Sequence, residues 1–188
     1  MPSALRRLRE TFLASPVVDK NGYPYFVNPI SDGIPLMDGE LLGEVIDGLI
    51  SITDLDCDMI LAPESMGIPL ATGITLRTGV PFSVIRKRRY GLPGEIALDQ
   101  TTGYSNSPMY INGVSEGDRV ILVDDVVSTG GTLEAIVNAL GAHGITISGI
   151  SVVYDKSKDI RSVEDRLGVP VRSLLRVGVV DGKPVILE

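Results

Sequence analysis

The sequence predicts an open α/β fold: a mostly parallel sheet with helices on both faces. Short apolar runs, typical of strands buried on both faces, occur at 59–62, 81–85, 119–123 and 145–154. Segments with helical periodicity or glycine-containing loops separate most of these runs. Strands that alternate with helices in this way indicate parallel pairing through crossover connections.

Four elements are predicted before the first of these strands. A short helix presents one apolar face and ends at Pro16; its face is made by Leu5, Leu8, Phe12 and Leu13. The pair Asn21-Gly22 separates the extended runs 17–18 and 23–27, which predicts a β-hairpin. We expect a loop at 28–36, and then a second amphipathic helix over 38–50.

The middle of the chain contains one unusual segment. The first sheet strand is followed by a loop at 63–67 and a helix to about residue 77. After the second strand, residues 86–107 show no apolar periodicity, and we expect a long loop there. Loops of this length within a compact domain are usually functional and often act as lids.

The last third returns to the alternating pattern. The third strand leads through a glycine loop into a helix at 132–140, and the fourth strand follows. The runs 174–180 and 184–187 flank Asp181-Gly182, which predicts a second hairpin. We find no internal repeat and no linker, so residues 1–188 are expected to form a single domain.

Composition excludes several classes of function. The chain has 17 basic and 24 acidic residues, a net charge of −7, which disfavours general binding to nucleic acid or anionic membranes. The single Cys57 and the single His143 exclude an internal disulfide and a histidine or cysteine metal cluster. No apolar run is long enough for a membrane span, and no secretory signal is evident at the N-terminus. We therefore expect a cytoplasmic protein.

The strongest motif is the segment 120–132, Val-Ile-Leu-Val-Asp-Asp-Val-Val-Ser-Thr-Gly-Gly-Thr. It predicts a buried strand that ends in Asp124 and Asp125, followed by a small-residue turn that opens a helix. The first turn of a helix offers free N–H groups and a positive dipole end, which suit a phosphate. Carboxylates would repel that phosphate and are better placed on sugar hydroxyls. No Gly-Lys-Ser/Thr follows the glycines, so this is not a P-loop.

This segment resembles the phosphoribosyl-pyrophosphate motif of the type I phosphoribosyltransferases. The resemblance implies that the acid pair, Asp124 and Asp125, binds the ribose hydroxyls. It also implies that the turn wraps the 5′-phosphate through Ser128, Thr129, Gly130, Gly131 and Thr132. The family works with Mg²⁺ held mainly by oxygens of the substrate, so we expect no metal site made by the protein alone.

Two further loops resemble pyrophosphate-binding parts of adenine-type and xanthine-type members. The loop Glu64-Ser65-Met66-Gly67 resembles a Glu-Ser-Arg-Gly loop, with Met66 where arginine is common. Arg86 and Lys87 open a run of four basic residues that resembles the Arg-Lys pair contacting pyrophosphate. A basic run in an acidic chain is where a polyanion would be held, although such runs are also often plain surface.

The segment of about 88–107 resembles the flexible hood that closes over the reaction in adenine-type enzymes. Closure would exclude water from the reactive anomeric carbon. The hood glutamate of the adenine-type enzymes has no match here, because Gly103 precedes Tyr104. Glu95 and Asp99 are the nearest acids in the segment. We therefore consider Glu95, Asp99 and Tyr104 as candidate hood residues for proton transfer.

Three residues are candidates for contact with the base. Lys156 follows the fourth strand, as does a lysine of related oxopurine enzymes, and its ammonium would donate to an exocyclic oxygen. Tyr154 in the same strand and Phe26 in the N-terminal hairpin are candidate base-binding aromatics. For Phe26, an aromatic in a hairpin, packing in the core is the more common role.

Nearly the whole chain resembles the archaeal hypoxanthine-guanine phosphoribosyltransferase subfamily, whose sequences are close to adenine-type enzymes. The resemblance implies purine salvage: phosphoribosyl pyrophosphate and a free purine base give IMP or GMP and pyrophosphate. It also implies a homo-oligomer, typically a dimer. Two alternatives remain open at this point, an adenine phosphoribosyltransferase that forms AMP and a non-catalytic, purine-responsive regulator.

Overall fold

The structure, a computed structural model, describes residues 5–20, 22–102 and 105–187, with the side chains of 99–107 left out. Its centre is a six-stranded sheet in the order β10-β9-β8-β7-β3-β4. The strands are β3 (Met59–Pro63), β4 (Phe82–Ile85), β7 (Arg119–Val127), β8 (Thr146–Asp155), β9 (Val171–Val180) and β10 (Lys183–Leu187). Only β10 pairs antiparallel, with β9, and the remaining pairs are parallel. The predicted fold class and the C-terminal hairpin are therefore confirmed.

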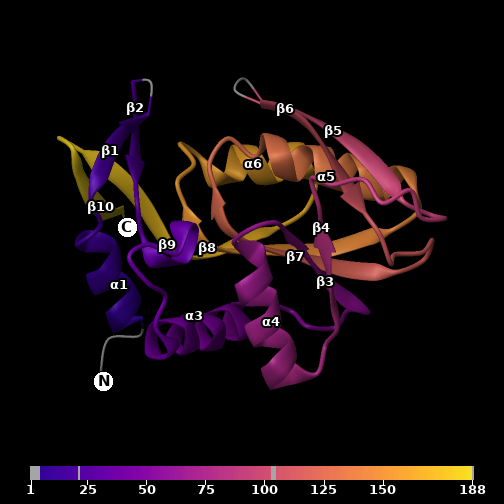
Figure 1. Cartoon of the computed structure of the whole chain (residues 1–188), viewed down its shortest axis with the longest axis horizontal. Helices are drawn as coiled ribbons and strands as arrows, with labels where there is room; N and C mark the ends of the chain where they lie inside the picture. The colour runs from indigo at the N-terminus through magenta and orange to yellow at the C-terminus, as the bar shows by residue number, and fades with distance from the viewer. Residues whose placement is uncertain (1–4, 21, 103–104, 188) are drawn as a thin grey trace.

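Helices cover both faces of this sheet (Figure 1). One face carries α1 (Arg6–Leu13), α3 (Gly39–Ile52) and α4 (Gly67–Thr78), and the other carries α5 (Gly131–Ala142) and α6 (Ile160–Leu167). Side chains alternate along a strand, so Ile121 and Val123 of β7 pack in the first core. Val120 and Leu122 pack in the second. None of the helices in the described ranges is long and apolar enough to cross a bilayer.

The N-terminal segment contains the predicted hairpin, β1 (Val17–Lys20) with β2 (Tyr23–Phe26). The predicted loop after it is partly wrong, because it holds one helical turn, α2 (Pro29–Asp32). The Asn28 side chain accepts hydrogen bonds from the N–H groups of Ile30 and Ser31, at 2.9 and 3.2 Å, and caps this turn.

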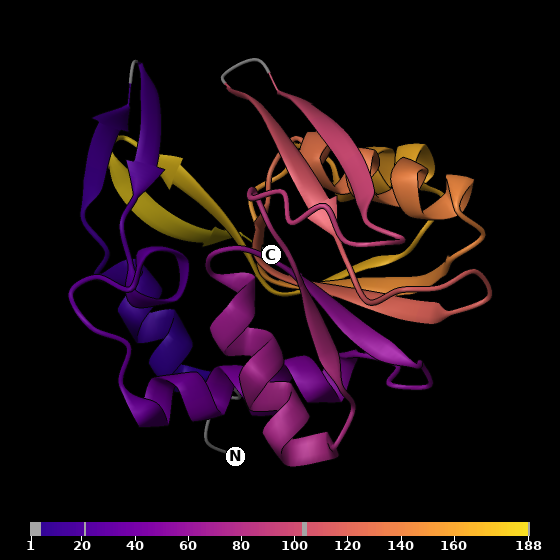
Figure 2. The ribbon, with the colours of Figure 1, turned by 45° about the vertical axis from the view of Figure 1, so that its right-hand side comes forward.

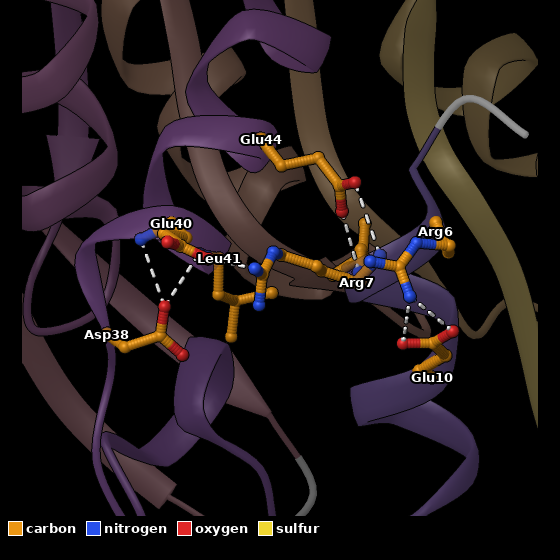
Figure 3. A network of polar contacts seen from close by, with 8 residues as sticks. Arg6, Arg7, Glu10, Asp38, Glu40, Leu41 and Glu44 are labelled. Carbon is orange, nitrogen blue, oxygen red and sulfur yellow. Dashed lines mark hydrogen bonds and ion pairs between the residues drawn. The ribbon is translucent and has the colours of Figure 1, made fainter. Parts of the chain in front are cut away.

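A polar network fastens α1 to α3 (Figure 3). The residue preceding α1, Leu5, provides no side-chain cap. Glu44 of α3 supplies one instead, since its carboxylate accepts from the N–H groups of Arg7 and Leu8 at 3.2 and 2.7 Å. Arg7 in turn pairs with Glu40. A carboxylate at a helix N-terminus also interacts favourably with the helix dipole, so this network stabilises the position of α1 against α3.

The second part of the segment expected to be a long loop is an antiparallel hairpin, β5 (Ile96–Thr102) with β6 (Ser105–Ile111), whereas residues 87–95 belong to no helix or strand. Alternate residues of its base are buried in the core shared with α5: Ile96, Leu98, Met109 and Ile111. This alternation of buried and exposed residues is short and is surrounded by polar residues, so the sequence alone did not predict the two strands. The β1–β2 and β5–β6 hairpins both project from the sheet toward the side on which α5 and α6 lie (Figure 2).

Candidate functional site

Most of the residues predicted from the sequence lie near the boundary between β3 and β7, where successive strands begin to be added to the sheet in the opposite direction. β3 connects through α4 to β4 on one face, and β7 connects through α5 to β8 on the other. Parallel pairing of β3 with β7 is limited to Met59–Leu61 against Val120–Leu122. In open α/β sheets, ligands bind at the carboxyl ends of strands at such a switch point.

The acid pair lies at this point but inside β7. Asp124 is still paired with Val152 of β8, and the strand continues to Val127, so the prediction that the strand ends at the acids is wrong. The N–H of Asp125 donates to Asp124 Oδ1 at 2.9 Å. Burial, followed by the charge of Asp125, raises the pKa of Asp124 well above its ordinary value. Burial also raises the pKa of Asp125, against hydrogen bonds with Asp124 and Ser31.

The loop after β3 faces the acid pair. The Glu64–Ser65 peptide bond is cis. The Glu64 carboxylate accepts from the Lys87 N–H at 2.7 Å and from Arg86 Nη1 at 3.0 Å. The hydrogen bond from the Lys87 N–H, followed by the Arg86 guanidinium, outweighs the opposing effect of partial burial and lowers the pKa of Glu64 below its ordinary value. Gly67 begins α4 so close to β7 that a Cβ there would lie 2.9 Å from the Val123 carbonyl oxygen.

A cavity of about 290 Å³ lies between this loop and the acid pair. We call it the acidic cavity; it is lined by Tyr25, Ser31, Pro63, Glu64, Ser65, Met66, Lys87, Met109, Asp124, Asp125 and Thr132. The structure thus brings together most residues predicted for ribose and pyrophosphate. Gly67 and Arg86 do not line the cavity: Gly67 packs on β7, and Arg86 reaches it only through Glu64.

A second cavity, of about 650 Å³, lies on the other side of the 128–132 turn. We call it the basic cavity because Lys156, Lys158, Arg166 and Arg176 line it, together with Ser128 and Thr129. Its wall is completed by Tyr23, Pro24, Ser157, Asp159, Ser162, Val163, Val177, Gly178, Val179 and Leu187. The residues predicted to wrap a 5′-phosphate therefore separate, since Thr132 faces the acidic cavity.

The turn itself has the conformation that its glycines permit. Gly130 has a φ of +82°, and it is the residue from which α5 begins at Gly131. A side chain at Gly130 would be strained and would also lie 2.9 Å from Val163 of α6. The turn is consequently a bend of backbone groups at a helix N-terminus, which is the arrangement that binds phosphate.

Lys156 lies in the basic cavity, as a base-contacting lysine would require. Its Nζ donates to the Pro24 carbonyl oxygen at 2.9 Å and lies 4.1 Å from the centre of the Tyr23 ring. The Tyr23 hydroxyl is 3.5 Å from Ser128 Oγ. Lys156 and Tyr23 together therefore connect the N-terminal hairpin with the 128–132 turn, a link that sequence spacing alone does not reveal.

The two aromatic base-binding candidates are core residues, which corrects the expectation for both. Tyr154 is fully buried and Phe26 is 4% exposed. Their rings pack against each other and against Phe12, with centroids 5.1 to 5.6 Å apart. The hairpin aromatics that line cavities are instead Tyr25, in the acidic cavity, and Tyr23, in the basic cavity; the Tyr25 hydroxyl donates to Asp32 Oδ1 at 2.7 Å. Neighbouring strand residues face opposite sides, so an inward Phe26 directs Tyr25 outward.

Of the hood candidates, only Glu95 has a described side chain. Its carboxylate accepts from the N–H groups of Tyr90 and Gly91 at 2.9 and 3.0 Å, and from Asn112 Nδ2 at 3.0 Å. Desolvation would raise the pKa of Glu95, but these hydrogen bonds lower it. The carboxylate therefore stabilises its own turn, and its role in proton transfer stays a prediction. Tyr104 and the side chain of Asp99 lie outside the described residues.

No group of three or more histidine, cysteine, aspartate or glutamate side chains converges as a metal site within the described part of the chain. The acidic cavity nevertheless has two adjacent carboxylates, Asp124 and Asp125. Mg²⁺ is commonly held by one or two carboxylates together with substrate phosphates and water. The donor set therefore fits Mg²⁺ that arrives with a phosphorylated ligand.

An α/β sheet with an acid pair and a glycine turn at its switch point defines a class of proteins that bind phosphorylated ligands at strand ends. Residues 36–167 match the family model described as the phosphoribosyl transferase domain, and the chain belongs to this family.

Curated relatives extend this similarity to nearly the full length. A protein of Methanobacterium paludis named hypoxanthine/guanine phosphoribosyltransferase is 51% identical over 180 residues, 96% of this chain and 95% of its own. A protein of the same name from Methanothermobacter thermautotrophicus is 50% identical, over 95% and 93% of the two chains. The resemblance inferred from the sequence is thereby confirmed.

Solved structures share the fold. An adenine phosphoribosyltransferase from Thermoanaerobacter pseudethanolicus superimposes with a TM-score of 0.73 at 24% identity, covering 90% of this chain and 99% of that one. The adenine phosphoribosyltransferase of Trypanosoma brucei, solved with AMP, pyrophosphate and ribose-5-phosphate, gives 0.73 at 22% identity, over 93% and 80%. At this identity the likeness concerns the fold alone.

Proposed function

We propose that the protein transfers the 5-phosphoribosyl group of phosphoribosyl pyrophosphate to hypoxanthine or guanine, releasing pyrophosphate. The observation that carries this proposal is the 124–132 segment: its acid pair faces one cavity, and its glycine turn borders a second of opposite charge. Full-length relatives named hypoxanthine/guanine phosphoribosyltransferase, at 46–51% identity, support the choice of bases.

In this proposal the acidic cavity receives the ribose and the pyrophosphate. Asp124 and Asp125 accept hydrogen bonds from the ribose hydroxyls, and Lys87 and the 64–67 loop contact the pyrophosphate. Asp124 and Asp125 would also contribute ligands to Mg²⁺, which, when bound with the substrate, neutralises charge on the leaving pyrophosphate. The raised pKa of both acids is consistent with a site that awaits a cation.

The basic cavity receives the 5′-phosphate and the base. Ser128, Thr129 and the amides of the turn hold the phosphate, and Lys156 donates to the 6-oxo group of the purine. An ammonium suits a carbonyl oxygen and not the amino group of adenine. To do so, Lys156 exchanges its hydrogen bond with the Pro24 carbonyl for one with the base.

Catalysis then depends mainly on alignment and charge. The base nitrogen attacks the anomeric carbon, the bond to pyrophosphate breaks, and positive charge develops on the ribose ring. The hairpin β5–β6 would close as the hood and exclude water. The candidates for accepting the proton from the base are Glu95, Asp99 and Tyr104. We further propose a cytoplasmic homodimer, by analogy with the family.

A turnover assay with four bases tests the proposal. Purified protein with phosphoribosyl pyrophosphate and Mg²⁺ would be given hypoxanthine, guanine, xanthine and adenine separately, with nucleotide formation followed by absorbance or chromatography. We expect IMP and GMP, and little AMP. AMP as the main product would favour the adenine alternative. Tight binding of phosphoribosyl pyrophosphate without turnover of any base would favour the regulator.

A further inference from the structure

Arg166 of α6 contacts the turn that carries the proposed 5′-phosphate site. Arg166 Nη2 donates to the Thr129 carbonyl oxygen at 2.6 Å, although 37 residues separate the two. Its Nη1 donates to the Ser162 carbonyl oxygen and hydroxyl at 3.1 and 3.3 Å. Its Nε lies 3.7 Å from Glu134 Oε2, on the first turn of α5. The planar guanidinium is therefore fixed from three directions.

Fixing this carbonyl fixes the peptide that follows it. A peptide unit is planar, so its C=O and N–H point in opposite directions when it is trans. Anchoring the Thr129 oxygen on Arg166 therefore directs the Gly130 N–H away from the guanidinium. Gly130 is enclosed on the same side, because a Cβ built on it would lie 2.9 Å from Val163 Cγ1 and 3.4 Å from Arg166 Nη2. A carbonyl free to rotate would instead be able to oppose an incoming phosphate with its own negative end.

We propose that Arg166 is a positioning residue that holds the 128–132 turn in its anion-binding form before the substrate arrives. This rests on the proposed function of that turn. Arg166 acts through the Thr129 carbonyl, and its fork of donors matters more than its charge. Lysine would keep the charge but lose the planar fork.

The test compares R166Q and R166K with wild type and with R161Q. Arg161 lies on the same helix, and R161Q removes the same charge as R166Q. The Arg161 side chain, however, makes no hydrogen bond or ion pair among the described residues. For each protein, kcat and KM are measured with hypoxanthine, and the Kd of phosphoribosyl pyrophosphate is measured by calorimetry without base.

We expect R166Q to raise the KM and Kd for phosphoribosyl pyrophosphate about tenfold, as for loss of a hydrogen bond from a charged group. The KM for hypoxanthine and the melting temperature should stay close to the values of R161Q. R166K should recover only part of the loss. Full recovery in R166K would show that charge alone matters, and a Kd of R166Q equal to that of R161Q would show no role in the site. Either result overturns the inference.

A lower kcat in R166Q, with the KM values of both substrates raised to the same extent and a lower melting temperature, would show a purely structural role. That result would also overturn the inference. Failure of the proposed function is distinguishable from these outcomes. If wild type binds phosphoribosyl pyrophosphate but converts no purine, the transferase proposal fails, whereas the Kd series still tests Arg166.

Discussion

The two cavities on either side of the 124–132 segment differ in charge and in construction. Among the described residues, the acidic cavity is lined by three carboxylates and one ammonium: Glu64, Asp124, Asp125 and Lys87. The basic cavity is lined by four cationic side chains and one carboxylate: Lys156, Lys158, Arg166, Arg176 and Asp159. The first is formed mainly at the ends of the parallel strands β3 and β7, and the second by the β1–β2 hairpin, α6 and β9.

This difference implies two ways of holding phosphate in one molecule. A phosphate monoester can bind in the basic cavity on protein groups alone, because cations and amides surround it. A pyrophosphate in the acidic cavity would meet carboxylates and needs additional positive charge. The proposed function therefore separates a step that should depend on Mg²⁺ from one that should not.

Removal of Mg²⁺ should give the largest effect and tests the difference between the two cavities directly. With EDTA in excess, we expect turnover of hypoxanthine to fall to background and to return when Mg²⁺ is added. Binding of IMP, measured by calorimetry in the same buffer, should weaken by no more than roughly threefold, since no pyrophosphate is present. Turnover that persists in EDTA, or IMP binding that disappears with it, would contradict the division into two cavities.

Substitution of Asp125 by asparagine should have the next largest effect. The amide keeps the shape but loses an acceptor for a ribose hydroxyl and a ligand for the cation, so kcat/KM should fall about a hundredfold. D165N, on an exposed position of α6, is the control for loss of one acidic charge. Steady-state kinetics of both variants would decide the matter, and equal activity would remove the acid pair from the site.

Loss of the Lys156 ammonium probes the other cavity. K156Q should raise the KM for hypoxanthine about tenfold, because the donor to the oxo group and its charge are lost. The KM for phosphoribosyl pyrophosphate should change less. K183Q, a charge-matched change on β10, should leave both values unaltered. If K156Q affects the two substrates equally, its bond to Pro24 in the hairpin matters more than contact with the base.

The two cavities also differ in how well the elements around them could be predicted from the sequence. The strands around the acidic cavity were predicted because continuous apolar runs and a dense local motif are independent of distant context. Around the basic cavity, α6 was missed: only Val163 and Leu167 of its eight residues are buried, so its apolar face is very short. Its capping residues, Asp159 and Gly168, were the available indication.

Side-chain direction was the other limit. The hairpin register decides whether Phe26 or Tyr25 enters the core, and that register depends on packing against Phe12 and Tyr154 from distant parts of the chain. The hydrogen-bond donors to Glu95 likewise meet only in the folded chain: some belong to the turn of Glu95 itself, and one is Asn112. Sequence motifs therefore located most residues that line the acidic cavity, but not the direction of the hairpin aromatics or the hydrogen-bond partners of Glu95.

The smallest expected effect concerns the stability of the acidic cavity without ligand. Burial raises the pKa of Asp124 above its ordinary value of 3.8, so the folded protein binds this proton more tightly than the unfolded chain does. The resulting stabilisation is full below the unfolded pKa and is lost as the pH rises through the folded pKa. At neutral pH the buried charge is a destabilising feature that asparagine lacks.

D124N should therefore melt about 3 °C higher than wild type at pH 8, and the difference should shrink as the pH falls toward 4. Melting curves at several pH values, without Mg²⁺ or ligand and with D165N as control, measure this directly. A D124N variant less stable than wild type at pH 8 would mean that the carboxylate is satisfied within the fold. In that case the cavity would not need an incoming cation, and the contrast between the two cavities would lose its physical basis.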